Sequence, residues 1–300
     1  MTALDIAHFI GEPAREEARS VGRDGIRWNL GAHISHWSPS SLAMARRCPY
    51  QFQQRYIRGL KERPGEAPVT GTAVHTALER NFEQKIASRE DLPLSELIEW
   101  YWDIGWPTTV QIEQARAEDE VSWDEGSGPD FARERGRAML TAYHSGVAPR
   151  IQPLAVEGLF ETDLFNLPVP VIGRFDIERE TSVIDVKTGK QKRSTPKEDW
   201  RLQAGIYGEV RGKGVEFHSV TMTKAGTVNV VTPLEAEAML VHPSFAQRQR
   251  MREDIRAISF EVCLYMELYG PDEPWPQHGR LHSWACSYCG WRSSCPAWAE

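Results

Sequence analysis

Residues 169–189 read VPVIGRFDIERETSVIDVKTG, and this stretch decides the fold. Its two halves, VPVIGRFDIERE and SVIDVKTG, are rich in β-branched residues and predict two short strands. A turn between antiparallel strands would bring Asp176 and Asp185 to neighbouring positions. Because side chains alternate along a strand, Asp185 and Lys187 should share one face. The stretch therefore predicts two carboxylates and a lysine at one place.

This combination suits a hard cation with an ammonium group beside it. Mg²⁺ and Mn²⁺ take oxygen ligands and lower the pKa of a bound water, and Lys187 could orient that water or stabilise phosphate charge. The alternative is a surface turn with an i,i+2 ion pair, because D-x-K is common by chance. Ile184 and Val186 flank Asp185, and an unpaired carboxylate in an apolar strand is costly, which favours the metal site.

The flanking segments complete an α/β core around this pair of strands. Gln203 and Tyr207 are four residues apart, so they share a helix face and could contact a substrate or Lys187. His75 lies in another helix, where a lone histidine is more often structural. The expected strands are 155–165, 215–223 and 227–232. The expected helices are one over LAMARRCPYQFQQRYI, residues 42–57, after an N-cap at 38–41, and others at 71–84, 130–143, 200–210 and 243–269.

The order of these elements divides the chain into four parts. Residues 1–35 form an N-terminal extension, and 36–147 form a helical region that contains Cys48 and His75. Residues 148–242 form the core, and 243–300 form a long helix followed by a cysteine-rich tail. No internal repeat is visible.

Four cysteines form the second candidate site. Cys286, Cys289 and Cys295 follow a C-x2-C-x5-C pattern, and two thiolates at C-x2-C spacing can chelate one ion or cluster. Cys48 can complete the site only if the N-terminal helix lies against the tail. Zinc and [4Fe-4S] both accept four thiolates, so spacing does not decide between them, and unrelated thiols are the alternative. Cys263 has apolar neighbours and is expected to be a buried structural cysteine.

Composition gives a weaker and partly misleading signal. The chain has 41% hydrophobic and 26% charged residues, without a secretory signal or membrane span, so we expect a cytoplasmic globular protein with no membrane partner. Its 42 acidic and 35 basic residues give a net charge of -7, which alone argues against nucleic acid. However, residues 89–134 hold 13 acids and 3 bases, whereas 46–63 and 187–201 each hold six bases. Each basic segment could still be a merely solvated face.

Several blocks together resemble the RecB-like branch of the PD-(D/E)xK nucleases. SPSSLAMARRCPYQFQQRYI, GTAVHTALE, VEGLFETDLFNLPVPVIGRFDIE, VIDVKTGK and WRLQAGIYG occur in the order and approximate spacing of that branch, over about residues 36–296. CSYCGWRSSCP resembles the tail of its iron-sulfur members, which include CRISPR-associated exonucleases, AddB-type helicase-nuclease subunits and phage recombination nucleases. The resemblance implies a restriction-endonuclease-like α+β core, a mixed sheet flanked by helices, with the cysteine tail closing an iron-sulfur site.

The same resemblance assigns residue roles. It implies that the metal ligands are His75, Asp176, Asp185 and the carbonyl of Val186. Lys187 would be the catalytic lysine, Gln203 and Tyr207 the Q-x3-Y motif, and Cys48, Cys286, Cys289 and Cys295 the cluster ligands. Glu157 matches a frequently acidic position. The chain has no Walker A sequence, which implies a stand-alone nuclease without its own helicase motor.

We therefore expect a DNA exonuclease dependent on Mg²⁺ or Mn²⁺ that acts on single strands or ends in recombination, repair or CRISPR spacer acquisition. A [4Fe-4S] cluster is expected, with Zn²⁺ as the less favoured occupant, and a helicase, recombinase or CRISPR integration complex as partner. The alternative is a non-catalytic DNA-binding or assembly factor that keeps the fold and a structural Zn or Fe-S staple.

Both basic segments supply candidate phosphate contacts for such a nuclease, which predicts steep salt dependence. They are Arg46, Arg47, Arg55, Arg58, Lys61 and Arg63, and Lys190, Lys192, Arg193, Lys197 and Arg201. Tyr50, Phe52 and Trp200 could stack on unpaired bases, although helix packing is the competing role. We expect the acidic segment 89–134 to lie away from the DNA path or to guard its entrance.

Overall fold

The computed structural model describes residues 30, 33–192, 197–223, 225–231, 245–277, 283–287 and 289–298. The chain forms two compact units that interleave along the sequence. Unit 1 comprises Met1–Leu60, Glu161–Ile172 and Arg252–Glu300, and unit 2 comprises Lys61–Phe160 and Gly173–Met251. The predicted parts 36–147, 148–242 and 243–300 therefore each contribute to both units. No helix among the described residues is long and apolar enough to cross a membrane.

A five-stranded mixed sheet forms the centre of the fold. Its strands are β1 (Ala155–Thr162), β2 (Val171–Glu178), β3 (Ser182–Gly189), β4 (Gly214–Met222) and β5 (Val228–Val231), in the order β1-β2-β3-β4-β5. β2 and β3 are antiparallel, β3 and β4 are parallel, and β4 and β5 are antiparallel. The parallel pair needs a crossover, which is provided by helix α7 (Glu198–Arg211). This sheet with its flanking helices confirms the predicted α+β fold.

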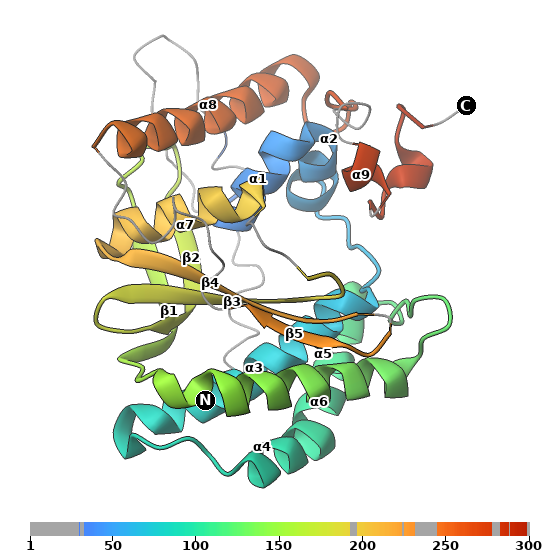
Figure 1. Ribbon diagram of the computed structural model, residues 1–300. Coiled ribbons are helices and arrows are strands. Elements are labelled where there is room, and N and C mark those ends of the chain that lie inside the picture. Colours follow the sequence, from blue (N-terminus) through green and yellow to red (C-terminus); the bar gives the residue numbers. More distant parts are fainter. Residues whose placement is uncertain are drawn as a thin grey trace. The chain divides into compact units, whose positions relative to one another are not determined.

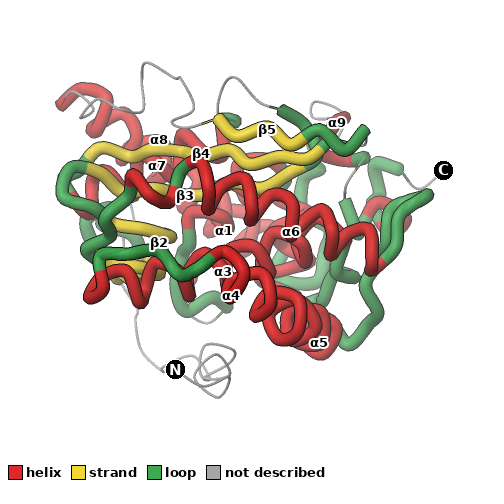
Figure 2. The backbone as a smooth tube through the Cα atoms, turned by 60° about the horizontal axis from the view of Figure 1, so that its bottom comes forward, coloured by secondary structure: helices red, strands yellow, loops and turns green. Residues whose placement is uncertain are grey.

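Helices cover both faces of the sheet, so the central strand β3 is buried from Ser182 to Val186. Helices α3 (Glu66–Ser88) and α6 (Pro129–Gly146) pack on one face, and α7 packs against β3 and β4 on the other (Figure 1, Figure 2). The side of α3 that enters the core carries Ala73, Ala77 and other small or apolar residues. Such small side chains let a helix approach a sheet closely. His75 is a residue of this closely packed helix.

The acidic segment is mostly helical. It contains α4 (Leu94–Trp100), the π-helical turn η4 (Tyr101–Gly105) and α5 (Trp106–Ala117), then a non-helical connection, and it ends in the first turns of α6. The short 3-10 helix η5 (Ala148–Arg150) then leads from α6 into β1. The hydrophobic core of unit 2 includes the buried side chains of Leu97, Tyr101 and Trp106, so the acidic segment is part of the packed structure.

The N-terminal helical block differs from the single helix expected from its sequence. Ser38 caps α1 (Pro39–Arg47) in a capping box with Ser41, as its sequence indicates. The helix then stops at Cys48, which is extended, and α2 (Pro49–Phe52) and the π-helical turn η3 (Gln53–Ile57) follow. Pro49 explains the break, because the residue before a proline is disfavoured in the helical conformation.

In unit 1 the N-terminal helices lie against the C-terminal tail. The Tyr50 hydroxyl donates a hydrogen bond to the carbonyl of Ser294 (3.0 Å), and Gln53 Nε2 donates to the carbonyl of Glu273 (2.7 Å). Phe52 is fully buried and stacks on Trp275. Tyr50 and Phe52 are thus packing residues of this unit. The other elements of the C-terminal region are α8 (Phe245–Tyr269), α9 (Ser283–Cys286) and η6 (Arg292–Ser294); residues 243–244 of the predicted helix lie outside the described residues.

A buried charged network on β4 makes the stability of the fold depend on pH. Glu216 is buried, forms an ion pair with Arg179 and lies 3.4 Å from His218 Nε2. Burial raises the pKa of Glu216, but hydrogen bonds from His218 and Ser182 and the charge of Arg179 outweigh it and hold that pKa at about 2. The His218 ring also bonds to the Tyr143 hydroxyl (2.7 Å) and so connects β4 to α6.

Replacing Glu216 with glutamine is expected to lower the free energy of unfolding at pH 7 by on the order of 3 kcal/mol. The folded pKa is depressed, so the contribution is complete above the ordinary pKa of about 4.5 and is lost as pH falls towards about 2. Urea unfolding at several pH values should show the gap between Glu216→Gln and wild type narrowing below pH of about 4.5. A gap that stays constant down to pH of about 3 would contradict this assignment.

Candidate active site

The hairpin of β2 and β3 opens where its charged residues lie. Ile177 pairs with Ile184 and Glu178 with Val183, so Asp176 and Asp185 come next in the register as predicted. At this position a side chain, not a backbone carbonyl, accepts the hydrogen bond between the strands: Asp176 Oδ2 accepts it from the Val186 amide (2.6 Å). The Asp176 carboxylate is thereby fixed next to Asp185 in the hairpin.

Asp185 and Lys187 share a face of β3, and a network from α7 holds them. Lys187 Nζ lies 2.6 Å from Asp185 Oδ2 and donates to Gln203 Oε1 (2.9 Å). The amide nitrogen of Gln203 donates to Asp185 Oδ1 (2.8 Å) and lies within hydrogen-bonding distance of the Tyr207 hydroxyl, also 2.8 Å. Tyr207 in turn donates to the carbonyl of Arg174. Gln203 of the predicted Q-x3-Y pair thus contacts the lysine, and Tyr207 contacts Gln203.

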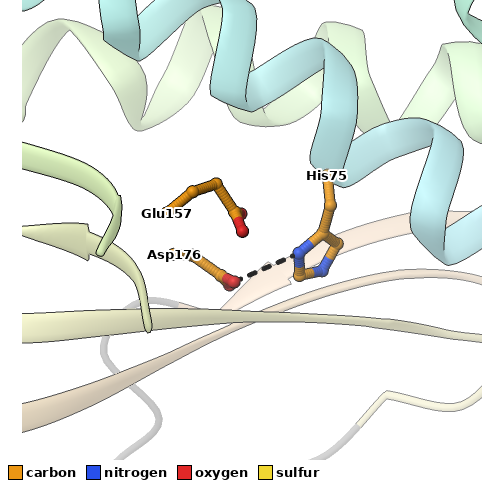
Figure 3. A group of neighbouring side chains, drawn as sticks. All are labelled: His75, Glu157 and Asp176. Carbon is orange, nitrogen blue, oxygen red and sulfur yellow. Dashed lines mark ion pairs between the residues drawn. The ribbon is translucent and has the colours of Figure 1, made fainter. Parts of the chain in front are cut away.

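A second group, made of side chains that could bind a metal ion, adjoins this network and includes His75 (Figure 3). His75 Nδ1 on α3 lies 3.4 Å from Asp176 Oδ1. Among the described residues, one group of three or more metal-ligating side chains has its ligand atoms all within 4.8 Å of one another, and it consists of His75, Glu157 and Asp176. The structure thus groups Glu157 with two predicted ligands, while Asp185 lies beside them in the lysine network.

Burial and mutual repulsion raise the pKa values of several carboxyl groups here. The pKa of Glu157 rises to about 7, from burial and then from the charges of Asp176 and Glu79. Burial, with Asp176 adding, raises the pKa of Asp185 to about 6 against the opposing effect of Lys187. Burial lowers the pKa of His75, but the charge and hydrogen bond of Asp176 outweigh it and raise it to about 9. Crowded carboxylates of this kind attract cations.

The pocket lined by these potential metal ligands also suits a small hard cation in size. His75, Glu157 and Asp176 line a pocket with room for about one water molecule, together with Glu79 and Val186. Asp185 Oδ2 is buried, and Lys187 Nζ lies 2.6 Å from it. Carboxylate oxygens with one imidazole nitrogen are ligands that Mg²⁺ and Mn²⁺ accept. The residues present therefore fit such an ion.

Sequence reasoning gave Glu157 little weight and missed Glu79. Glu79 lies four residues after His75, one helical turn away on the same face of α3, and this spacing could have revealed it. Glu157 owes its position to an unusual backbone, because it has a φ of 49° within β1. A non-glycine residue in the left-handed region leaves no simple sequence pattern.

Gly158 supports this conformation of Glu157. A Cβ atom on Gly158 would lie 2.0 Å from Cζ of Phe175, so β1 can cross the Phe175 ring only without a side chain there. Gly158→Ala is therefore expected to destabilise the protein by about 1–3 kcal/mol and to displace Glu157. Gly146→Ala is the control, because its Cβ would meet nothing within 4 Å. Equal thermal midpoints for the two variants would show that this packing is not constrained.

The four cysteines of the predicted cluster gather in unit 1. Cys295 forms a small apolar cluster with Tyr50 and Trp291, and Cys48 and Cys289 pack against this cluster. Burial, with the neighbouring thiols of Cys48 and Cys286 adding, raises the pKa of Cys295. The contact between chain ends that Cys48 requires is thus present. Cys263 is buried, and burial raises its pKa to about 12, as expected of a structural cysteine.

The predicted phosphate contacts fall in different surroundings. Lys61, Arg63 and Lys190 form ion pairs with carboxylates of the acidic segment. Lys197 Nζ lies 5.9 Å from the centre of the half-buried Trp200 ring, and Lys187 Nζ lies 5.8 Å from it. Arg46, Arg47, Arg55 and Arg58 belong to unit 1, and Arg193 lies outside the described residues.

Comparison with known proteins gives a family match over most of the chain. The sequence profile of the PD-(D/E)XK nuclease superfamily matches residues 36–296. No curated protein sequence matches the chain. A crystal structure of a "Putative exonuclease" from Eubacterium rectale is 7% identical with a TM-score of 0.47, over 87% of this chain and 90% of that one. The crystal structure of SSO0001 is 16% identical with a TM-score of 0.33, over 75% and 96%. Similarity at this level says nothing about activity.

Proposed function

Because this chain belongs to the PD-(D/E)XK nuclease superfamily, we propose that it is a metal-dependent DNA exonuclease that hydrolyses phosphodiester bonds on single strands or at DNA ends. The observation that carries the proposal is the junction of the His75, Glu157 and Asp176 group with the Asp185, Lys187 and Gln203 network. We propose that this activity serves recombination, repair or CRISPR spacer acquisition, with a helicase, recombinase or CRISPR integration complex as partner, and the resemblance to the RecB-like branch supports this.

The side chains of the site have distinct roles in this proposal. His75, Glu157 and Asp176 would hold the cation, with Asp185 and the Val186 carbonyl as the further ligands that the resemblance implies. Bound Mg²⁺ or Mn²⁺ would supply a water of lowered pKa and positive charge for the phosphate. Gln203 bonds to both Lys187 and Asp185, so it holds the ammonium group in one position. That ammonium can stabilise the negative charge that develops on the phosphate.

Labelled single-stranded and double-stranded DNA, incubated with the protein and Mg²⁺ or Mn²⁺, tests this function. We expect shortened products from the wild type, none after chelation by EDTA, and none from Asp185→Ala. Equal products from Asp185→Ala would overturn the assignment. Binding of DNA without products in either metal would favour the alternative, a non-catalytic DNA-binding or assembly factor.

We also propose that Cys48, Cys286, Cys289 and Cys295 bind a [4Fe-4S] cluster, with Zn²⁺ as the less favoured occupant. The proximity of these thiols and the resemblance to the iron-sulfur members support the proposal. Four thiolates from both ends of unit 1 would fasten the tail to the N-terminal helices, as a structural metal site does.

Cys295→Ser is expected to lose nearly all visible absorption of protein purified without oxygen. Wild type should be brown, with a band near about 400 nm. Cys263→Ala, which changes a cysteine outside this group, should keep the band and the iron content. A colourless wild type that contains zinc would contradict the cluster.

A further inference from the structure

The part of the acidic segment that follows α5, residues 118–125, runs beside the chain that leads into α3. We name it the acidic strap. The amide of Ser122 donates to the carbonyl of Pro64 (2.8 Å), and the amide of Glu66 donates to the carbonyl of Ser122 (3.0 Å). These bonds form a parallel bridge between Gly65 and Ser122. The backbone of the strap is therefore fixed against residues 64–66.

Apolar side chains anchor the strap as well. Val121 is buried in the core of unit 2, and the Trp123 ring lies 6.2 Å from the Trp106 ring. The amide of Asp124 donates to Glu66 Oε2 (3.1 Å). The strap is thus part of the folded unit rather than a loose acidic tail.

The carboxylates of the strap pair with bases that were candidates for binding phosphate. Glu118 pairs with Lys61, and Asp124 pairs with Lys190. Arg63 Nε donates to the carbonyl of Glu120 (2.9 Å) and lies 3.9 Å from Asp119 Oδ1. Bases from both basic segments, which are far apart in the sequence, thus meet one short acidic stretch.

The pairing changes the charge at one side of the active site. Lys190, which pairs with Asp124 of the strap, directly follows the last residue of β3, so the strap borders the end of β3. The strap holds five acids, Glu118, Asp119, Glu120, Asp124 and Glu125, against the three bases that it contacts. This border is therefore net acidic and repels phosphate.

We propose that the acidic strap sets one boundary of the nucleic-acid path, because it withholds Lys61, Arg63 and Lys190 from phosphate contacts. The inference rests on the proposed DNA-binding function and deepens it. It makes Glu118, Asp119 and Asp124 specificity determinants: they decide which bases contact the substrate, although none of them touches the reacting atoms.

A triple variant, Glu118→Gln with Asp119→Asn and Asp124→Asn, tests the proposal. Its binding to a labelled single-stranded oligonucleotide is measured in EDTA over a range of salt concentrations. Each base released to a phosphate steepens the slope of log K against log salt by about 0.7, so Lys61 and Arg63 together add about 1.4. Lys190 keeps its second partner, Glu66, in this variant. The control is Glu90→Gln with Glu99→Gln and Asp103→Asn, which changes the net charge equally at exposed positions outside the strap and should leave the slope unchanged.

A mutant cycle separates release of bases from a general charge effect. Lys61→Ala with Arg63→Ala should leave the salt slope of the wild type unchanged, but should remove about 1.4 from that of the triple variant. An unchanged slope in the triple variant, or weaker binding of the wild type after Lys61→Ala with Arg63→Ala, would overturn the inference alone. If neither wild type nor triple variant binds the oligonucleotide, the proposed function fails and the inference fails with it.

Discussion

Asp176→Asn is expected to lower nuclease activity by roughly 10³-fold or more, because several kcal/mol of metal-dependent stabilisation would be lost. Asp176 joins both parts of the site: one carboxylate oxygen faces His75 at 3.4 Å, and the other accepts the Val186 amide at 2.6 Å. Asparagine keeps the size of the side chain but removes its negative charge, and it has an NH2 group in place of one carboxylate oxygen. Initial rates on labelled DNA in saturating Mn²⁺ measure the effect.

The matched control for Asp176→Asn lies on the same hairpin. Glu180 is exposed in the turn between β2 and β3, so Glu180→Gln removes one negative charge without touching the site. It should retain activity within about twofold, since most exposed substitutions have small effects. Far-ultraviolet circular dichroism should show both variants folded. Activity of Asp176→Asn close to that of Glu180→Gln would remove Asp176 from the catalytic site.

Glu66→Ala is expected to cost about 3–5 kcal/mol of folding free energy, the largest effect on stability that we predict. The Glu66 carboxylate is fully buried and pairs with Arg135, whose side chain is only 5% exposed. Lys190 Nζ lies 3.3 Å from Glu66 Oε1, and the Asp124 amide donates a hydrogen bond to Glu66 Oε2. Alanine would leave the Arg135 charge buried without this partner. Denaturant unfolding at neutral pH measures the loss.

Two variants make the test of Glu66 specific. Glu118→Ala breaks an exposed pair with Lys61 and should cost at most about 1 kcal/mol. Glu66→Ala combined with Arg135→Leu removes both buried charges and should recover part of the loss. A loss below about 1 kcal/mol for Glu66→Ala would show that the buried pair contributes little.

The sequence predicted the centre of the site because local periodicity governs it. A period of two places Asp185 and Lys187 on one face of β3, and helical spacing places Gln203 and Tyr207 together on α7. The neighbouring positions of Asp176 and Asp185 follow from a short turn between two strands. In each case the partners are near one another in sequence, so elementary geometry is enough.

The sequence was less informative where the backbone departs from regular structure. It suggested one helix through Cys48, whereas the chain breaks there before Pro49. Its pattern assigned no definite role to Glu157, which has a positive φ within β1 next to the point where Gly158 crosses Phe175. Neither feature has a periodic signature.

By itself, then, the sequence determined the order of the strands and helices, the residues that carry charge on the hairpin, and the spacing of the cysteine tail. Only the tertiary structure decided that Glu157 and Glu79 line the pocket of His75, and that the acidic strap pairs with Lys61, Arg63 and Lys190. The physical reason is range. Backbone periodicity acts between neighbours along the chain, whereas an ion pair depends on the distance in space between groups that the fold alone brings together.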